Sequence, residues 1–193
     1  MKKLALTDFA KYRYPSALEL SPDGRYLTFA LKEVDREGDG YRWNLWLYDL
    51  ESRESRQITR GDDQRQAVWE DNTHILYKTT ELDEAMRARG FEEEWTVYHR
   101  LNVCTGEERE AFRLPMSVSG LWKMDEGRYV FTGETHLDRP NLLELTGEAL
   151  EKELVRRQQT KGYKVLTELP LCENGVGMFN QTRITLFLYL EAT

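Results

Sequence analysis

Short runs of alternating apolar and polar residues, separated by turn residues, fill most of the chain. The first two runs, 16–21 and 25–34, flank Pro22-Asp-Gly24, which is typical of a tight turn between two strands. A third run, 43–50, alternates leucines with aromatic residues and predicts a strand with two different faces. A shorter run at 55–59 completes four expected antiparallel strands in about 45 residues, the size of one β-propeller blade.

The same order of parts recurs twice further along the chain. Residues 68–77 and 121–131 each repeat the apolar strand, polar turn and apolar strand of the first hairpin, at intervals of roughly 50 residues, within the range of propeller repeats. Third strands are expected at 97–103 and at 186–193, and the last of these echoes 45–52. Three imperfect copies with matching order indicate three blades.

A leader precedes the first copy. Residues 7–13 predict a short helix, with Thr7 as its N-cap. Phe9 and Tyr12 lie three residues apart on one side of this helix, and we expect them to dock it onto an apolar surface.

Two further segments interrupt the repeats between the second and third strands. Residues 81–91 are rich in helix formers. In the longer insertion, 141–160, Thr146 is a candidate N-cap for a helix that places Leu150 and Leu154 on one face.

The sequence therefore predicts an all-β fold, a partial propeller of about three four-stranded antiparallel blades. Three incomplete blades cannot close a ring, so we expect a piece of a longer protein with open blade edges. Such edges would also allow a homo-oligomer. The expected parts are a leader at 1–15, blades at 16–63 and 64–116, and an incomplete blade at 117–193 with a helical insertion at 138–181.

Composition limits the partners and the location. The 193 residues are 40% hydrophobic and 32% charged, and the net charge of −7 argues against nucleic acid or an anionic membrane as partner. No long apolar stretch follows the first lysines, so we expect no signal peptide, and no run approaches the ~20 apolar residues that span a membrane. Cys104 and Cys172 fit no disulfide or zinc pattern, so we expect free thiols in the cytoplasm.

No cofactor or metal site is expected either. The three histidines, His74, His99 and His136, occupy unmatched positions of the repeats, whereas a metal ion needs several converging ligands. Most of the five tryptophans recur at matching positions, which favours packing between blades over a ligand cage.

Several segments resemble the N-terminal part of prolyl oligopeptidase family serine peptidases, in particular the acylaminoacyl-peptidase and dipeptidyl-aminopeptidase branch. The resemblance runs along the whole chain and is carried by 6–13, 20–25, 44–50, 56–59, 163–170, 174–179 and 186–189. It implies a seven-bladed propeller that covers the active site and screens substrates by size. It also implies a C-terminal α/β-hydrolase domain with a Ser-Asp-His triad.

The chain departs from the family in ways that bear on catalysis. It contains no Gly-x-Ser-x-Gly elbow, because Ser117-Val-Ser-Gly120 lacks the first glycine and precedes an expected strand. Leu190 stands where an aspartate is expected, and Trp69-Glu-Asp-Asn72 has lost the Ser-Pro-Asp-Gly turn. No catalytic residue is therefore assigned.

The expected function is to gate and select short peptides, with acylated or free N-termini, for a hydrolase domain outside this chain. The alternative is a non-enzymatic TolB-like propeller that binds proteins. Dipeptidyl peptidases of the resembled family hold the substrate's amino group with a pair of propeller glutamates, so the resemblance makes Glu93 and Glu94 candidate substrate-binding residues. Carboxylates at a strand edge are also a common device against aggregation.

Overall fold

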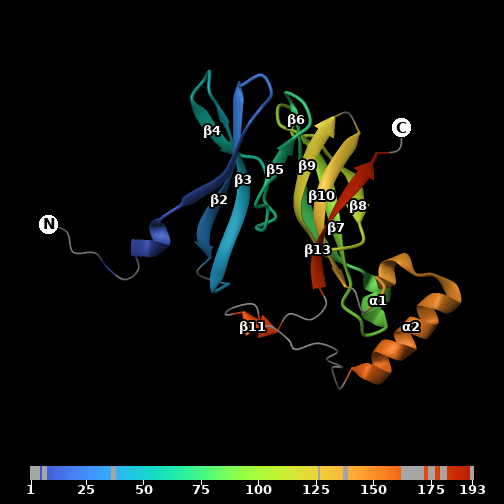
Figure 1. Cartoon of the computed structure of the whole chain (residues 1–193). Helices are drawn as coiled ribbons and strands as arrows, with labels where there is room; N and C mark the ends of the chain where they lie inside the picture. The colour runs from blue at the N-terminus through green and yellow to red at the C-terminus, as the bar shows by residue number, and fades with distance from the viewer. Residues whose placement is uncertain are drawn as a thin grey trace. The chain divides into compact units, whose positions relative to one another are not determined.

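The computed structural model describes residues 5, 8–35, 38–125, 127–136, 139–161, 172–173, 177–178 and 182–191 (Figure 1). The chain divides into two compact units. One unit is Met1–Thr80 with Val97–Arg113, and the other is Glu81–Thr96 with Leu114–Thr193.

The first sheet is antiparallel, in the order β1-β2-β3-β4, and lies in the first unit. The turn between β1 and β2 forms as predicted: the Ser21 hydroxyl donates a 2.6 Å hydrogen bond to Asp23, and Gly24 has a φ of +73°. Glycine adopts this left-handed conformation without steric cost. The strands are β1 (Tyr14–Leu20), β2 (Tyr26–Asp35), β3 (Gly40–Asp49) and β4 (Glu54–Gln57).

The second sheet has the order β5-β6-β7-β8. Its strands are β5 (Ala67–Trp69), β6 (His74–Leu82), β7 (Glu94–Asn102) and β8 (Glu108–Leu114). A shared core joins it to the first sheet. The buried members of this core are Ala30, Leu45, Leu47, Ala67, Trp69, Ile75, Tyr77, Leu101 and Val103. Leu45 and Leu47 are buried and the intervening Trp46 only partly so, which confirms the alternation predicted for the third strand.

The third sheet, in the second unit, has three strands among the described residues, in the order β13-β10-β9. The strands are β9 (Val118–Asp125), β10 (Arg128–His136) and β13 (Thr182–Leu190). β10 and β13 pair without a register shift from Arg128 opposite Leu190 to His136 opposite Thr182. The all-β fold of antiparallel blade-like sheets is confirmed.

The two predicted helical insertions are present in the second unit. Helix α1 (Glu84–Ala88) is capped by Asp83, which accepts a hydrogen bond from the backbone N–H of Met86. Helix α2 (Gly147–Thr160) begins after Thr146, although the Thr146 hydroxyl forms no capping hydrogen bond. Met86, Leu142 and Leu154 form a small core. The other elements of this unit are the 3₁₀ turn η2 (Leu142–Glu144), β11 (Cys172–Glu173) and β12 (Gly177–Met178).

The leader differs from its prediction. It is a single 3₁₀ turn, η1 (Asp8–Lys11). Phe9 and Tyr12 are 55% and 54% exposed, so the expectation that they dock the leader onto an apolar surface was wrong. Only seven residues, Asp8 to Tyr14, separate the predicted cap from Pro15, which leaves little room for a stable helix, since a helical nucleus gains stability only by extension.

None of the helices in the described ranges is both long enough and apolar enough to cross a membrane.

Candidate functional site

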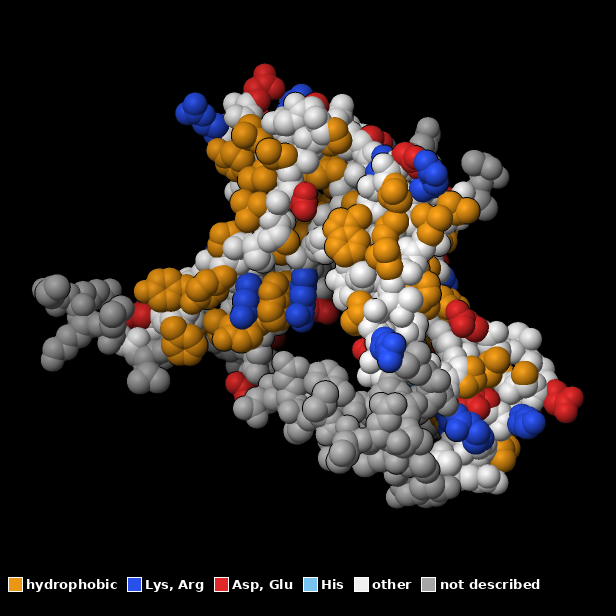
Figure 2. Space-filling model, viewed as in Figure 1, with side chains coloured by type: hydrophobic (Ala, Val, Ile, Leu, Met, Phe, Trp, Pro, Cys, Tyr) orange, Lys and Arg blue, Asp and Glu red, His pale blue; other side chains and the backbone are white. Residues whose placement is uncertain are grey.

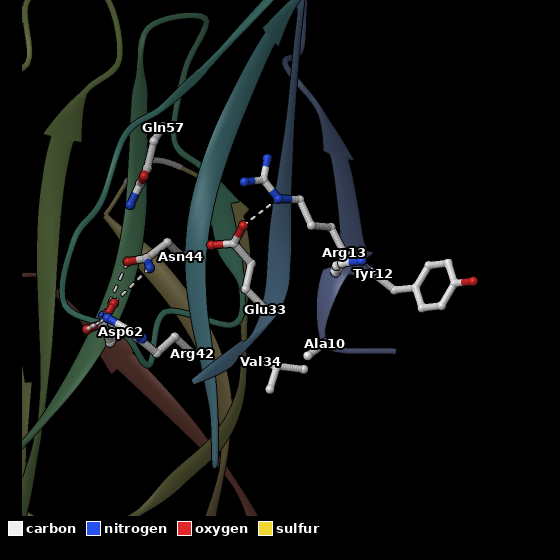
Figure 3. Close-up of a pocket in the computed structure, with 10 residues that line it drawn as sticks. Ala10, Tyr12, Arg13, Glu33, Val34, Arg42, Asn44, Gln57 and Asp62 are labelled. Atoms are coloured by element: carbon white, nitrogen blue, oxygen red, sulfur yellow. Dashed lines mark hydrogen bonds and ion pairs between the residues drawn. The ribbon is translucent and has the colours of Figure 1, made fainter. Parts of the chain in front are cut away.

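A cavity of about 440 Å³ opens in the first unit between the leader, β2, β3 and the loop after β4 (Figure 3). Its lining is strongly polar. The residues around it are Ala10, Lys11, Tyr12, Arg13, Glu33, Val34, Arg42, Asn44, Gln57 and Asp62.

The cations of this cavity already have acidic partners. The Nε atom of Arg13 lies 2.6 Å from a carboxylate oxygen of Glu33, and Arg42 lies 3.0 Å from Asp35. Lys11 pairs with Asp8 across one turn of the leader. With the charges balanced in this way, the lining suits a polar, hydrated ligand that carries both donors and acceptors better than a simple anion.

The far wall of the cavity is held by a reciprocal side-chain contact. The amide of Asn44 donates to the carboxylate of Asp62 at 3.0 Å, and the backbone N–H of Asp62 donates back to Asn44 at 3.2 Å. Asn44 is 7% exposed, and Asp62 has a φ of +64°. Aspartate tolerates the left-handed region better than most residues, and these bonds hold it there.

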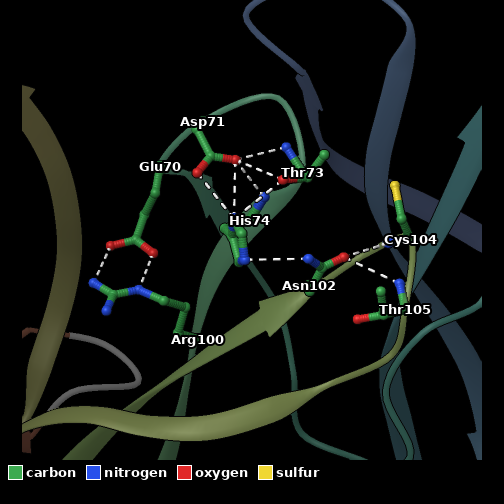
Figure 4. Close-up of polar contacts among 8 residues, drawn as sticks. All are labelled: Glu70, Asp71, Thr73, His74, Arg100, Asn102, Cys104 and Thr105. Atoms are coloured by element: carbon green, nitrogen blue, oxygen red, sulfur yellow. Dashed lines mark hydrogen bonds and ion pairs between the residues drawn. The ribbon is translucent and has the colours of Figure 1, made fainter.

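A second polar cluster ties two turns of the second sheet together (Figure 4). Asp71 lies 2.9 Å from Nδ1 of His74, and Nε2 of His74 lies 3.2 Å from the Asn102 amide nitrogen. The side-chain oxygen Oδ1 of Asn102 in turn accepts hydrogen bonds from the backbone N–H groups of Cys104 and Thr105. Figure 4 shows the Cys104 thiol pointing away from the His74 imidazole, so these two side chains do not form a nucleophile–base pair.

Asp71 carries the largest downward shift of a carboxyl pKa in this cluster. Burial by itself raises the pKa of Asp71, but hydrogen bonds from the backbone and side chains of Thr73 and His74 outweigh it and lower the pKa from 3.8 to about 2. The bonds favour the ionised form because each is made to the carboxylate.

We expect Asp71→Ala to lower the free energy of unfolding at pH 7 by about 1 kcal/mol, the net value of an ordinary hydrogen bond. Because folding lowers the pKa of Asp71, its contribution is present above pH 3.8 and is lost as the pH falls through about 2. Urea denaturation at pH 7 and in steps down to pH 2 would measure this. Asp63→Ala, which removes an exposed carboxylate paired with exposed Arg65, is the control. A difference that persists unchanged at pH 2 contradicts the assignment.

The two glutamates predicted to bind substrate lie in the second unit and differ in their surroundings. The Glu93 carboxylate is half-buried and 2.8 Å from a guanidinium nitrogen of Arg157 on α2. Glu94 begins β7 and is exposed. A role for this pair in binding an amino group stays a prediction.

The described histidines take part in different contacts. His74 belongs to the Asp71 cluster, and Nε2 of His99 forms a 2.9 Å hydrogen bond with the Thr79 hydroxyl. Within the described ranges, no group of three or more potential ligands could hold a metal ion.

The cavity residues were missed by the sequence analysis. The Asn44–Asp62 contact spans 18 residues, and an aspartate in a loop between strands is by itself typical of a solvated turn. Its positive φ is the feature that distinguishes it, and only the backbone conformation reveals that.

Together, the antiparallel sheets define the chain as part of a β-propeller. No protein-family model matches the sequence, and no curated protein matches it.

Three solved peptidases share this fold. The chain is similar to the acylaminoacyl peptidase of Pyrococcus horikoshii, with a TM-score of 0.61 and 12% identity over 95% of this chain. It is also similar to an acylaminoacyl peptidase in complex with Z-Gly-Gly-Phe-chloromethyl ketone, with a TM-score of 0.62 and 11% identity over 96% of this chain. For the apo AtxE2 isopeptidase the TM-score is 0.50, with 14% identity over 89% of this chain.

The match covers only part of each of these proteins. The chain spans 24% of the two acylaminoacyl peptidase chains and 26% of the isopeptidase chain. At these identities the likeness concerns the fold.

Proposed function

We propose that this chain is the N-terminal part of a substrate-selecting propeller in a serine peptidase that acts on short peptides with acylated or free N-termini. The observation that carries the proposal is the shared fold with peptidases over at least 89% of the chain. Catalysis is assigned to an α/β-hydrolase domain outside the chain, because the sequence holds no Gly-x-Ser-x-Gly elbow. We place the protein in the cytoplasm, where the exposed thiol of Cys104 would stay reduced.

The 193-residue chain alone should not hydrolyse acyl-alanyl or dipeptidyl chromogenic substrates. The gene sequence beyond Thr193 tests the complementary claim, since the proposal requires a Gly-x-Ser-x-Gly elbow there. In the resulting enzyme, deletion of residues 1–193 should widen the size range of peptides that are cleaved. Hydrolysis by the isolated chain would refute the assignment of catalysis, and a gene without the elbow would favour the non-enzymatic interaction module.

We further propose that Glu93 and Glu94 contribute to recognition of a free amino group in that enzyme. Two adjacent carboxylates suit an ammonium ion, although the Glu93 carboxylate would have to bind the ammonium and the Arg157 guanidinium at the same time. Glu94→Gln should therefore raise KM for free-amino peptides more than Glu93→Gln does. N-acylated peptides, which lack the ammonium, are the control substrates. Equal KM values for the variants and the unaltered enzyme would end this proposal.

A further inference from the structure

Two turns of the second sheet are joined through the imidazole of His74 (Figure 4). One turn connects β5 to β6 and contains Asp71, and the other follows β7 and begins after Asn102. Both belong to the first unit. No histidine is visible on the face drawn in Figure 2, and the side chain of His74 is 34% exposed. The imidazole is therefore half-buried but still within reach of protons from the solvent.

The side-chain amide of Asn102 has only one possible orientation. Its Oδ1 accepts the backbone N–H groups of Cys104 at 2.9 Å and Thr105 at 3.0 Å. Rotating the amide by half a turn would direct its NH₂ group at these two donors, so Nδ2 is the atom that faces His74, at 3.2 Å from Nε2. Because Nδ2 can only donate, Nε2 of His74 accepts this hydrogen bond and carries no proton.

The other ring nitrogen carries the proton. Nδ1 of His74 lies 2.9 Å from the Asp71 carboxylate, which is ionised above about pH 2 and can only accept. The Thr73 hydroxyl, 3.1 Å from Nδ1, donates its own proton to Asp71 and so is also an acceptor here. A neutral imidazole with its proton on Nδ1 thus satisfies every contact in this cluster.

A second proton on His74 is compatible with only one side of the cluster. The imidazolium keeps its hydrogen bond to Asp71, but its Nε2–H faces the Nδ2 donor of Asn102. The titratable or charged residues of the first unit around this contact are Arg56, Glu70, Asp71, Arg100 and Cys104. Glu70 binds Arg100 at 2.7 Å, and the carboxylate that contacts His74 is that of Asp71, at Nδ1 rather than Nε2.

We propose that His74 is a proton-sensitive switch between these two turns. Neutral His74 links Asp71 to Asn102 and holds the turn after β7 against the turn between β5 and β6. When His74 is protonated, the imidazolium stays with Asp71 and the contact with Asn102 opens. The backbone N–H of Val103 still donates to the carbonyl of Thr73 at 2.8 Å, so the change is local. This inference goes beyond the proposed peptidase role and does not depend on it.

NMR spectroscopy of the 193-residue chain from about pH 8 to about pH 5, the range in which histidine changes charge, tests the proposal. At the upper end, the ¹⁵N shifts of His74 should show a proton on Nδ1 and none on Nε2. As His74 gains its second proton, the side-chain NH₂ signals of Asn102 should shift along the same titration curve. Those of the backbone amides of Cys104 and Thr105 should follow them.

Asn102→Asp reverses the switch, because it places an acceptor opposite Nε2 and can still accept the two backbone N–H groups. Both nitrogens of the imidazolium would then be satisfied, so His74 should titrate at a pH at least ~1 unit higher. The matched control is Asn72→Asp, which adds the same charge to an exposed residue of the turn that contains Asp71. It should move the titration of His74 much less. Circular dichroism at both ends of the pH range would check that each variant folds.

Three results would each overturn the proposal. The first is a proton on Nε2 of His74 at about pH 8, which would mean that Asn102 does not donate to it. The second is a set of Asn102 signals that do not respond when His74 titrates. The third is an equal shift of the His74 titration in Asn102→Asp and Asn72→Asp, which would reflect added charge alone.

Discussion

Replacing Arg157 by methionine should destabilise the second unit by about 3 kcal/mol, the usual result of removing one partner from a buried ion pair. The Arg157 side chain is only 12% exposed, and its guanidinium donates to Glu153 at 3.0 Å and to Glu93 at 2.8 Å. It also donates to the carbonyl of Pro140. The variant keeps an aliphatic side chain but removes the positive charge that faces the carboxylates of Glu93 and Glu153. Helix α2 should therefore detach more readily.

Arg156→Met is the matched control for this prediction. Arg156 is the neighbouring residue of α2 and also binds Glu153, but its side chain is 49% exposed. Exposed pairs contribute about 1 kcal/mol or less. Hydrogen exchange of the α2 amides, together with urea denaturation, would measure both variants. Equal loss of protection in the two would show that Arg157 does not anchor the helix.

How far the sequence predicts this fold depends on how local each feature is. The first turn was predictable because its determinants, Ser21 to Gly24, are adjacent in the chain and bond to one another. The insertions were predictable from helix-forming composition and from their place between repeats. Alternation likewise indicated that Leu45 and Leu47 belong to the core.

The register of the last strand could not be predicted in the same way. The echo of 45–52 in 186–193 equates Leu188 with Leu47, a buried position. In the structure, Leu188 lies opposite Val130, and the first sheet pairs Leu27 with Tyr48 in the equivalent place. Leu188 therefore corresponds to Tyr48 rather than to Leu47. A slip of one residue exchanges the two faces of a strand, and a run of alternating leucines does not determine the register.

The cavity was beyond prediction for a related reason. The contacts that shape it join segments that are separated in sequence, such as Arg13 with Glu33 and Asn44 with Asp62, and each of these residues alone is typical of a solvated surface. The same applies to Arg157, whose partner Glu93 lies 64 residues away. Glu93 was singled out from the sequence as a ligand for an ammonium ion. In the structure it binds a guanidinium of the chain itself, and this cationic partner had no local signal.

The core between the first and second sheets leads to the remaining prediction. Leu45 is fully buried among Leu47, Trp69 and Ile75. Its backbone is also fixed, since its N–H donates to Thr59 and its carbonyl accepts the N–H of Ile58. The surrounding strands cannot readily collapse into a void at such a position, so Leu45→Ala should cost about 3 kcal/mol, from lost burial and the remaining cavity.

Leu20→Ala removes the same atoms from a leucine of the same sheet that is 56% exposed, and should change the free energy of unfolding by no more than about 0.5 kcal/mol. Urea denaturation followed by tryptophan fluorescence would measure both, because Trp69 lies in the affected core. Similar losses in the two variants would mean that this core does not hold the sheets together. A large loss confined to Leu45→Ala would show that the first two blades are stabilised chiefly by packing against one another, which a propeller requires if each blade is to support the next.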